Sequence, residues 1–274
     1  MCRVLAIVIS LFSAVMAEAQ GLQSFGVAYY DVDKLYDTEP SSFYDDSDYT
    51  PSGRLRWNEE RYAVKINNVV QVVDSMSMPV VVLYGVENEQ VVRDIVSRSH
   101  EDYAYIYRPL SSRDGLDFAV LYFGDRFFPE RITPWRGALC VEGWVGQEPL
   151  TIIANHRSAS IGVLIDERNL LRADNNIILL GTPNKLNFNE YGLSDATLAA
   201  ERAGRGNYMS SGHWQMRDRI ATNIKMRSRC DVYITRWMLN DMGAPKPTFD
   251  KRKYYGGYGN YLPIFIYFDE ILVD

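Results

Sequence analysis

The fold of this chain is decided by residues 80–88, which read Val80-Val81-Val82-Leu83-Tyr84-Gly85-Val86-Glu87-Asn88. Four consecutive apolar residues are typical of a strand buried on both faces of a sheet, and this run passes directly into a polar cluster. Two other apolar runs end in the same way, at residues 150–158 (LTIIANHRS) and 177–184 (IILLGTPN). Polar groups at the ends of neighbouring strands converge on one crevice, the usual place for a functional site in α/β proteins.

The rest of the pattern predicts many strands and few helices. Further strands are expected at residues 24–30, 103–107, 118–123, 139–145 and 262–268, and shorter helices at 90–98 and 195–203. A longer helix is expected to begin after Asn58, a favourable N-cap, and to end before Pro79. Many strands with few helices between them indicate an α/β fold in which two mixed β-sheets pack as a β-sandwich flanked by helices.

Residues 1–19 are predicted to be a signal peptide. Arg3 supplies a positive charge, residues 4–17 are almost wholly apolar, and Ala17-Glu18-Ala19 fits the small-x-small rule for cleavage. The alternative for this segment is a buried N-terminal helix. The apolar run is too short for a stable membrane span, and no other segment is apolar enough. We therefore expect residues 20–274 to form a single exported domain, either periplasmic or extracellular.

The net charge and the cysteine content bear on three possibilities: nucleic-acid binding, a disulfide and a zinc site. The net charge of −6 gives no support to binding nucleic acid without sequence preference, which usually needs a basic face. Cleavage of the leader would leave Cys140 and Cys230. They would either pair in an oxidising compartment or remain as free thiols, and they have no zinc-binding spacing.

Short segments along most of the chain follow a recognisable order. They are Tyr30-Asp31-Val32-Asp33-Lys34-Leu35-Tyr36-Asp37-Thr38, Tyr49-Thr50-Pro51 with Trp57, Glu60, Arg61, Tyr62 and Lys65, then residues 83–88, Gly115-Leu116-Asp117-Phe118-Ala119-Val120-Leu121-Tyr122, Asn155-His156, residues 181–185 and residues 259–263. In order and spacing the chain resembles the endonuclease/exonuclease/phosphatase superfamily, and in particular its secreted bacterial branch. The corresponding family motifs include Asn-Val-Glu-Asn-Leu-Phe-Asp, Leu-Gln-Glu-Val-Glu-Asn, Gly-Asp-Phe-Asn-Asp and Ser-Asp-His-x-Pro. The interval between His156 and Gly181 is short for this family.

The resemblance implies a β-sandwich flanked by helices, with one or two Mg²⁺ or Mn²⁺ ions at one edge and a water that attacks a phosphate in line. This chemistry needs oxygen ligands for a hard cation and a positioned His–Asp pair. It also needs donors for the charge that builds on the phosphate.

Four positions depart from the residues that the resemblance implies. The metal-binding Glu of the family falls at Gly85, and the Asp beside the attacking water falls at Thr182. The closing Asp and His fall at Asn260 and Tyr261. The first-strand Asn falls at Asp31, an acid that remains a candidate cation ligand.

The family's residues stand unchanged at four other positions, which are the candidate catalytic residues: Asn155, His156, Asn184 and Asp218.

These losses predict a degenerate active site. Glycine cannot bind a metal, threonine is a poor base, and a tyrosine with a pKa of about 10 cannot replace an imidazole at neutral pH. Loss of general acid–base help alone costs ~10²–10⁴-fold in rate. Glu87 is not expected to substitute for the missing ligand, because alternate residues of a strand point to opposite faces.

We therefore predict a pseudoenzyme that needs no cofactor and retains a binding role. A phosphorylated or nucleotide-like ligand, or another exported protein, is the expected partner. One alternative is an active Mg²⁺- or Mn²⁺-dependent phosphodiesterase or nuclease with a rewired site, which requires two or more carboxylates beside His156 in one pocket. Its residues would be Asp31, Asp117, His156, Asn184 and Asp218. A second alternative is a structural protein whose crevice is filled by Tyr84 and Tyr261, with His156 as an ordinary structural histidine.

Overall fold

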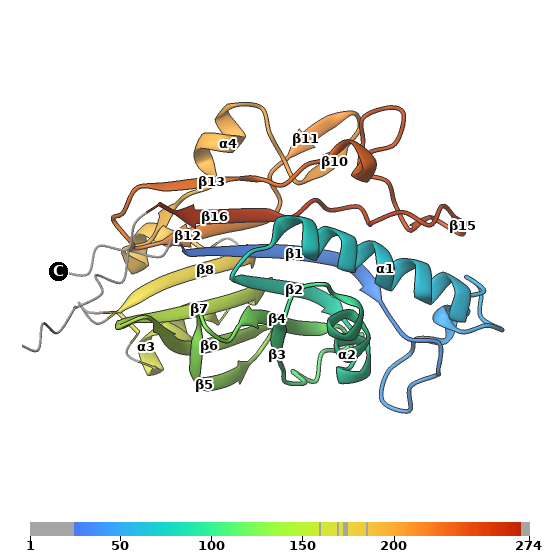
Figure 1. The fold of residues 1–274 in the computed structure, drawn as a ribbon, viewed down its shortest axis with the longest axis horizontal. Helices are drawn as coiled ribbons and strands as arrows, with labels where there is room; N and C mark the ends of the chain where they lie inside the picture. The colour runs from blue at the N-terminus through green and yellow to red at the C-terminus, as the bar shows by residue number, and fades with distance from the viewer. Residues whose placement is uncertain (1–24, 159, 169, 172–174, 185, 270–274) are drawn as a thin grey trace, which may run out of the picture.

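The computed structural model describes residues 25–158, 160–168, 170–171, 175–184 and 186–269. Two six-stranded sheets account for most of the strands in this part of the chain (Figure 1). The first sheet has the order β13-β16-β1-β2-β4-β3, and the second has the order β5-β6-β7-β8-β12-β9. Both sheets are mixed, with β1 parallel to β2 and β7 parallel to β8. The predicted fold class, an α/β fold with two packed mixed sheets, is therefore confirmed.

The first sheet is built from β1 (Phe25–Leu35), β2 (Val80–Val86), β3 (Tyr103–Tyr107), β4 (Asp117–Phe123), β13 (Ser228–Val232) and β16 (Ile264–Phe268). The second is built from β5 (Phe128–Trp135), β6 (Ala138–Val145), β7 (Glu148–His156), β8 (Asn176–Thr182), β9 (Ser194–Asp195) and β12 (Arg219–Thr222). Two short hairpins are formed by β10 (Tyr208–Ser210) with β11 (His213–Gln215) and by β14 (Phe249–Asp250) with β15 (Lys253–Tyr254). The helices are α1 (Glu59–Met76), α2 (Glu89–Arg98), α3 (Ile161–Glu167) and α4 (Leu198–Arg202).

Alternation along the strands divides the core into two layers. In β7, Ile152 belongs to the large cluster between the two sheets, whereas its neighbour Ile153 belongs to a smaller cluster that includes Ile161 and Ile165 of α3. Successive side chains of a strand point to opposite faces, so β7 contributes to the interior of the sandwich and to the layer beneath α3. In Figure 1, α1 runs along the first sheet and α3 lies beside the second.

The two longest helices, α1 and α2, each begin after an asparagine N-cap. Asn58 accepts a hydrogen bond from the backbone N–H of Arg61 at 3.1 Å and caps α1. Asn88 caps α2 in the same way, through the N–H of Val91 at 3.0 Å. An N-cap side chain satisfies one of the backbone donors that the first turn of a helix leaves free.

The prediction of a helix at residues 195–203 is wrong at its start. Ser194–Asp195 is the short strand β9, which pairs with β12, and the helix is limited to Leu198–Arg202. The Asp195 carboxylate accepts hydrogen bonds from both the N–H and the hydroxyl of Thr197, which turns the chain before the helix begins.

The last strand begins later than predicted. The N–H of Leu262 donates to the carbonyl of Asn207 instead of to a neighbouring strand, and Pro263 has no N–H to donate. Pairing of β16 therefore starts at Ile264.

The predicted leader, residues 1–19, lies outside the described residues. Within the described ranges, no helix is long and apolar enough to span a membrane. Cys140, which is buried, and Cys230, which is half-buried, are both free thiols.

Candidate functional site

The strand ends do converge, and a distortion of β1 and β2 shapes the place where they meet. The register of the β1–β2 ladder shifts between Asp31 and Leu35, and Asp33 and Lys34 have left-handed backbone angles with φ of 56° and 61°. Gly85 lies opposite with φ of +88°, a conformation that disfavours a side chain. A Cβ atom at this position would lie 3.5 Å from Oδ1 of Asp31. A side chain at residue 85 would therefore start beside Asp31.

A group of polar side chains, all buried except the half-buried Thr182, lies between the two sheets at these strand ends, and we call it the inner cluster. It comprises Tyr29 and Asp31 of β1, Thr182 of β8, and Asn207 and Asp218. Asp218 is fully buried, and both of its carboxylate oxygens accept hydrogen bonds: Oδ1 from the Thr182 hydroxyl at 2.6 Å and Oδ2 from Nδ2 of Asn207 at 2.6 Å. This carboxylate is thus committed to interactions within the protein.

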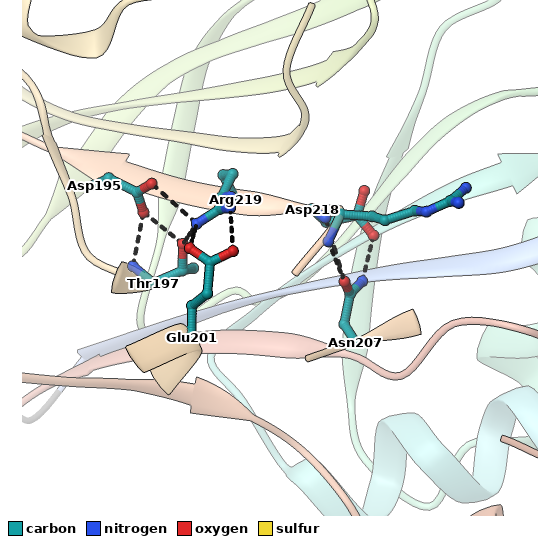
Figure 2. A network of polar contacts seen from close by, with 7 residues as sticks. Asp195, Thr197, Glu201, Asn207, Asp218 and Arg219 are labelled. Carbon is teal, nitrogen blue, oxygen red and sulfur yellow. Dashed lines mark hydrogen bonds and ion pairs between the residues drawn. The ribbon is translucent and has the colours of Figure 1, made fainter. Parts of the chain in front are cut away.

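Asn207 and Asp218 are held in place by a second network beside them (Figure 2). Oδ1 of Asn207 accepts from the backbone N–H of Asp218 at 3.3 Å. On the other side of β12, Arg219 makes a bidentate contact with Glu201 at 2.6 and 2.7 Å and lies 3.4 Å from Asp195. A bidentate guanidinium–carboxylate pair fixes geometry more strongly than a single contact, so α4 and β9 brace the segment that carries Asp218.

Asp31 is the second carboxylate of the inner cluster and is only 7% exposed. Its Oδ1 accepts from the N–H of Asp33 at 2.9 Å. Burial raises the pKa of Asp31 well above its usual value, and the negative charges of Asp218 and Asp33 raise it further. Burial also raises the pKa of Asp218. Two buried acids therefore share one region of low dielectric, which disfavours ionisation of both.

His156 lies at the end of β7, at the boundary of the inner cluster. Its ring stacks on that of Tyr84, with centroids 3.8 Å apart and planes 13° apart. Nδ1 lies 3.4 Å from the Thr182 hydroxyl. Burial, with a smaller effect of the Arg157 charge, lowers the pKa of His156 to about 4. The imidazole is therefore neutral at physiological pH.

The two retained asparagines occupy different environments. Asn155 is fully buried: its Nδ2 donates to the carbonyl of Thr182 at 3.3 Å, and its Oδ1 accepts from the N–H of Ser158 at 3.0 Å. It therefore closes the turn after β7. Asn184 is exposed and forms no hydrogen bond with another described residue. The structure does not bring Asn184 into the inner cluster.

Asn260 and Tyr261 also lie at this edge. The backbone N–H and the side-chain Nδ2 of Asn260 both donate to Oδ2 of Asp33, at 3.2 and 2.6 Å. Tyr261 packs against Tyr208 at a centroid distance of 5.1 Å. Burial, followed by the charges of Asp31 and other acids nearby, raises the pKa of Tyr261 to about 12. Its phenol therefore remains protonated at neutral pH.

Sequence reasoning missed the role of Lys65. This lysine lies on α1 and is 1% exposed, and its Nζ donates to the hydroxyl of Thr248 and to the carbonyl of Tyr258, both at 2.8 Å. Burial lowers its pKa to about 8, against the opposite effect of Asp33 and Asp31. Lys65 anchors the segment leading to Asn260. A lysine directly before the apolar position Ile66 was the signal that could have identified it.

A pocket of about 470 Å³, which we call the outer pocket, includes both rings of the Tyr84–His156 stack in its lining. It is lined by Asp45, Tyr84, Leu110, Ser112, Arg113, Asp114, Leu116, Asp117, Phe118, Gly137 and His156. Asp117 uses its carboxylate to bind the N–H of Leu110 and the hydroxyl of Ser112, at 3.0 and 2.8 Å. Asp117 therefore shapes the rim of the outer pocket and does not join Asp31 and Asp218.

Glu87 is turned away from the inner cluster. Its carboxylate accepts from the N–H of Asp37 at 2.6 Å and from the hydroxyl of Tyr44 at 2.8 Å. Burial raises the pKa of Glu87 to about 7. Its contacts hold the loop that carries Asp45 to the wall of the outer pocket.

Comparison with known proteins agrees with this architecture. Residues 26–169, just over half of the chain, match the model of the Endonuclease/Exonuclease/phosphatase family. The chain belongs to the endonuclease/exonuclease/phosphatase family. No curated protein matches the sequence.

Solved structures of family members share the fold at low sequence identity. TDP2 from C. elegans is 13% identical with a TM-score of 0.58, the match covering 93% of this chain and 78% of that one. D. rerio TDP2 complexed with a single-strand DNA product is 12% identical with a TM-score of 0.58, covering 90% and 99%. A family protein from Bacteroides thetaiotaomicron is 14% identical with a TM-score of 0.57, covering 90% and 98%.

The divalent cation expected in this family does not fit the residues of this member. Both oxygens of Asp218 accept hydrogen bonds from protein donors, and Gly85 has no side chain to offer. Among the described residues, no group of three or more histidine, cysteine, aspartate or glutamate side chains is placed to hold a metal ion. Asp31 is left as a single carboxylate, whereas Mg²⁺ requires near-octahedral oxygen coordination.

Proposed function

We propose that this chain is a catalytically degraded member of the endonuclease/exonuclease/phosphatase family, exported as a single domain, whose remaining role is binding. The observation that carries the proposal is the position of Thr182 between the two residues that would act as a His–Asp pair. The Thr182 hydroxyl donates to Asp218 at 2.6 Å and lies 3.4 Å from Nδ1 of His156. Asp218 is thus engaged by a hydroxyl and an amide and does not orient the imidazole.

The protonation behaviour of His156 supports loss of catalysis. A general base works best when its pKa lies near the working pH, and the pKa of His156 is about 4. No carboxylate hydrogen bond to His156 is present among the described residues to raise that basicity. The high pKa of Tyr261, about 12, removes the phenolate as a replacement base.

The outer pocket is the binding site that we propose. Arg113 offers a cation to a phosphate or a nucleotide-like ligand, and the half-buried ring of Tyr84 contributes aromatic surface. The DNA product bound by the D. rerio TDP2 structure supports a ligand of this class. The exposed carboxylate of Asp114 supports the other partner that we consider, an exported protein with a basic segment.

An active metal-dependent phosphodiesterase with a rewired site is the second candidate function, and one observation favours it. Asp45, Asp114 and Asp117 line the same pocket as His156. This observation is limited to the shared lining, because both Asp117 oxygens accept hydrogen bonds from protein donors and no group of the described residues is placed to hold a metal ion. A purely structural role is disfavoured because the outer pocket is open, although the Tyr84 ring covers one face of His156.

The test is hydrolysis of plasmid DNA and of a chromogenic phosphodiester by the purified protein with Mg²⁺ and Mn²⁺. We expect the same background rate for the wild type and for His156→Ala. His100→Ala is the matched control, because the His100 side chain is 92% exposed. Metal-dependent turnover that is lost only in His156→Ala would refute the loss of catalysis and favour the second candidate.

The binding role is tested on the same preparations with a fluorescent single-stranded oligonucleotide. We expect saturable binding that Arg113→Ala weakens and that Arg252→Ala, a change at another exposed arginine, leaves unaltered. Equal binding by both variants would exclude the outer pocket as the site.

A further inference from the structure

A second cavity, of about 510 Å³, adjoins the outer pocket, and we call it the tryptophan pocket. Leu110 belongs to the lining of both cavities. At two places consecutive residues are divided between them: Ser111 and Arg136 line the tryptophan pocket, whereas Ser112 and Gly137 line the outer pocket. The two cavities are therefore neighbours along two segments of the chain. The other residues that line the tryptophan pocket are Pro109, Pro134, Trp135, Ser160, Val163 and Glu167.

Trp135 is held in a fixed orientation at the wall of the tryptophan pocket. It is the last residue of β5 and is half-buried. Its Nε1 donates to the hydroxyl of Ser160 at 3.0 Å and to the carbonyl of the same residue at 3.3 Å. Its ring packs against the smaller apolar cluster, which includes Ile161 and Ile165. Because the indole N–H is already satisfied, the ring offers apolar aromatic surface to a ligand.

The turn that follows Trp135 is fixed against the outer pocket. Gly137, which has φ of +69°, accepts a hydrogen bond from the N–H of His156 at 2.9 Å through its carbonyl. A Cβ atom at residue 137 would lie 3.2 Å from the His156 carbonyl oxygen. Because His156 itself lines the outer pocket, this close approach fixes the position of one cavity relative to the other.

Two charged side chains of opposite sign line the tryptophan pocket. Arg136 and Glu167 are both exposed, and neither forms a hydrogen bond or an ion pair with another residue that the structure describes. Their donors and acceptors are therefore available to a ligand. Nucleobases outside a duplex are recognised by stacking on an aromatic side chain and by hydrogen bonds to their edges. Arginine donates to O6 and N7 of guanine, and a carboxylate accepts from the amino group of a base.

We propose that the tryptophan pocket is a nucleobase subsite, in which the base of a bound nucleotide stacks on Trp135 and guanine is preferred through Arg136 and Glu167. This inference rests on the proposed function, because the phosphate of the same nucleotide is bound at Arg113 of the outer pocket. It narrows the ligand class from phosphorylated molecules in general to those that carry a base. A sugar phosphate would occupy the outer pocket alone.

The experiment is calorimetric titration of the folded, full-length protein with guanosine 5′-monophosphate, uridine 5′-monophosphate and ribose 5-phosphate. We expect the guanine nucleotide to bind at least about tenfold more tightly than ribose 5-phosphate, because stacking of the base adds to the phosphate contact. Trp135→Leu should abolish this difference and leave the affinity for ribose 5-phosphate unchanged. Glu167→Gln should remove a preference of about fivefold for the guanine over the uracil nucleotide.

Trp144→Leu is the matched control. Trp144 lies on β6 and is 41% exposed, and its Nε1 donates to Glu130 at 3.1 Å. It lines neither cavity, so its replacement should leave all three affinities unchanged. Circular dichroism establishes folding of each variant. Trp135→Phe replaces the leucine variant if that one does not fold, and it should retain only part of the tenfold difference.

Two results would overturn the inference: equal affinities of the wild type for the guanine nucleotide and ribose 5-phosphate, or nucleotide binding that a folded Trp135 variant leaves unchanged. In both cases, ribose 5-phosphate binding that Arg113→Ala weakens would still support the outer pocket. Conversely, nucleotide binding that depends on Trp135 but not on Arg113 would support the base subsite and refute the phosphate site. Failure of all three ligands to bind, as expected for a protein partner, would refute both.

Discussion

The inner cluster and the outer pocket lie at the same strand ends but differ in almost every physical respect. In the inner cluster Asp218 is 0% exposed and Asp31 is 7% exposed, and Asp218 is fully hydrogen bonded by protein donors. In the outer pocket, Arg113 and Asp114 are exposed. The Tyr84–His156 stack lines the outer pocket, and His156 also lies 3.4 Å from Thr182 of the inner cluster. Position at the end of a strand therefore does not by itself make a site reactive, because solvation and hydrogen bonding decide what each carboxylate can do.

The largest expected effect comes from removing the carboxylate at the centre of the inner cluster. Asp218→Ala leaves the buried amide of Asn207 without its acceptor, and we expect it to lower the free energy of unfolding by about 3 kcal/mol. Asp114→Ala, at an exposed position in the outer pocket, should change it by less than about 0.5 kcal/mol. Urea unfolding of the two variants measures the difference. Equal changes in the free energy of unfolding would show that burial and hydrogen bonding do not distinguish Asp218 from Asp114.

The second effect concerns Glu87, whose loop contacts support the outer pocket. Its pKa in the folded protein is about 7, above its usual value, so between about pH 4.5 and pH 7 the folded state retains a proton that the unfolded chain releases. The free energy of unfolding is therefore highest below this range and falls as pH rises through it, by at most about 3 kcal/mol at ~1.36 kcal/mol per pH unit.

Glu87→Gln should remove this pH-dependent difference in unfolding free energy, and denaturant unfolding at a series of pH values measures it. Asp31 and Asp218 also have raised pKa values and add their own pH dependence. The quantity to compare is therefore the free energy of unfolding of the wild type minus that of the variant at each pH. A difference that does not vary with pH would contradict the assignment to Glu87.

The smallest effect tests the boundary between the two regions. Tyr84→Ala removes the ring stacked on His156 and admits water, so the pKa of His156 should rise from about 4 towards its ordinary 6.5, by about one pH unit. Titration of the imidazole resonances by NMR measures the shift. His100 and His213 are exposed and serve as internal controls. An unchanged pKa would show that Tyr84 does not shield His156.

Sequence periodicity predicted the long elements better than the short ones. The buried run at residues 80–83 and the capped helix after Asn58 were located correctly, because each combines a strong apolar pattern with a clear boundary. The strand β5 was missed, since Pro129 and Pro134 and several charges conceal its alternation at the edge of a sheet. The strands from β10 to β13 have at most five residues, which is too short for a reliable period.

The candidate site was predicted in part. Strand ends and family motifs correctly brought His156, Thr182 and Asp218 to one edge. They did not distinguish the exposed Asn184 from the buried Asn155, because a motif does not encode burial. Tyr29 was missed for a related reason: an aromatic residue in a strand is ordinarily a packing residue, and its packing against Gly181 joins distant parts of the chain.

Each of the two sheets contains one free thiol, whose reactivity can report on the opening of that sheet. Cys140 lies in β6 of the second sheet, and Cys230 lies in β13 of the first. Burial raises the pKa of both to about 12, which suppresses the reactive thiolate while the protein is folded. The rate at which an alkylating reagent modifies each cysteine, read by peptide mass spectrometry, would therefore measure how often each sheet opens. Comparison of the two alkylation rates would show whether the two sheets unfold together or separately, and it requires no added label.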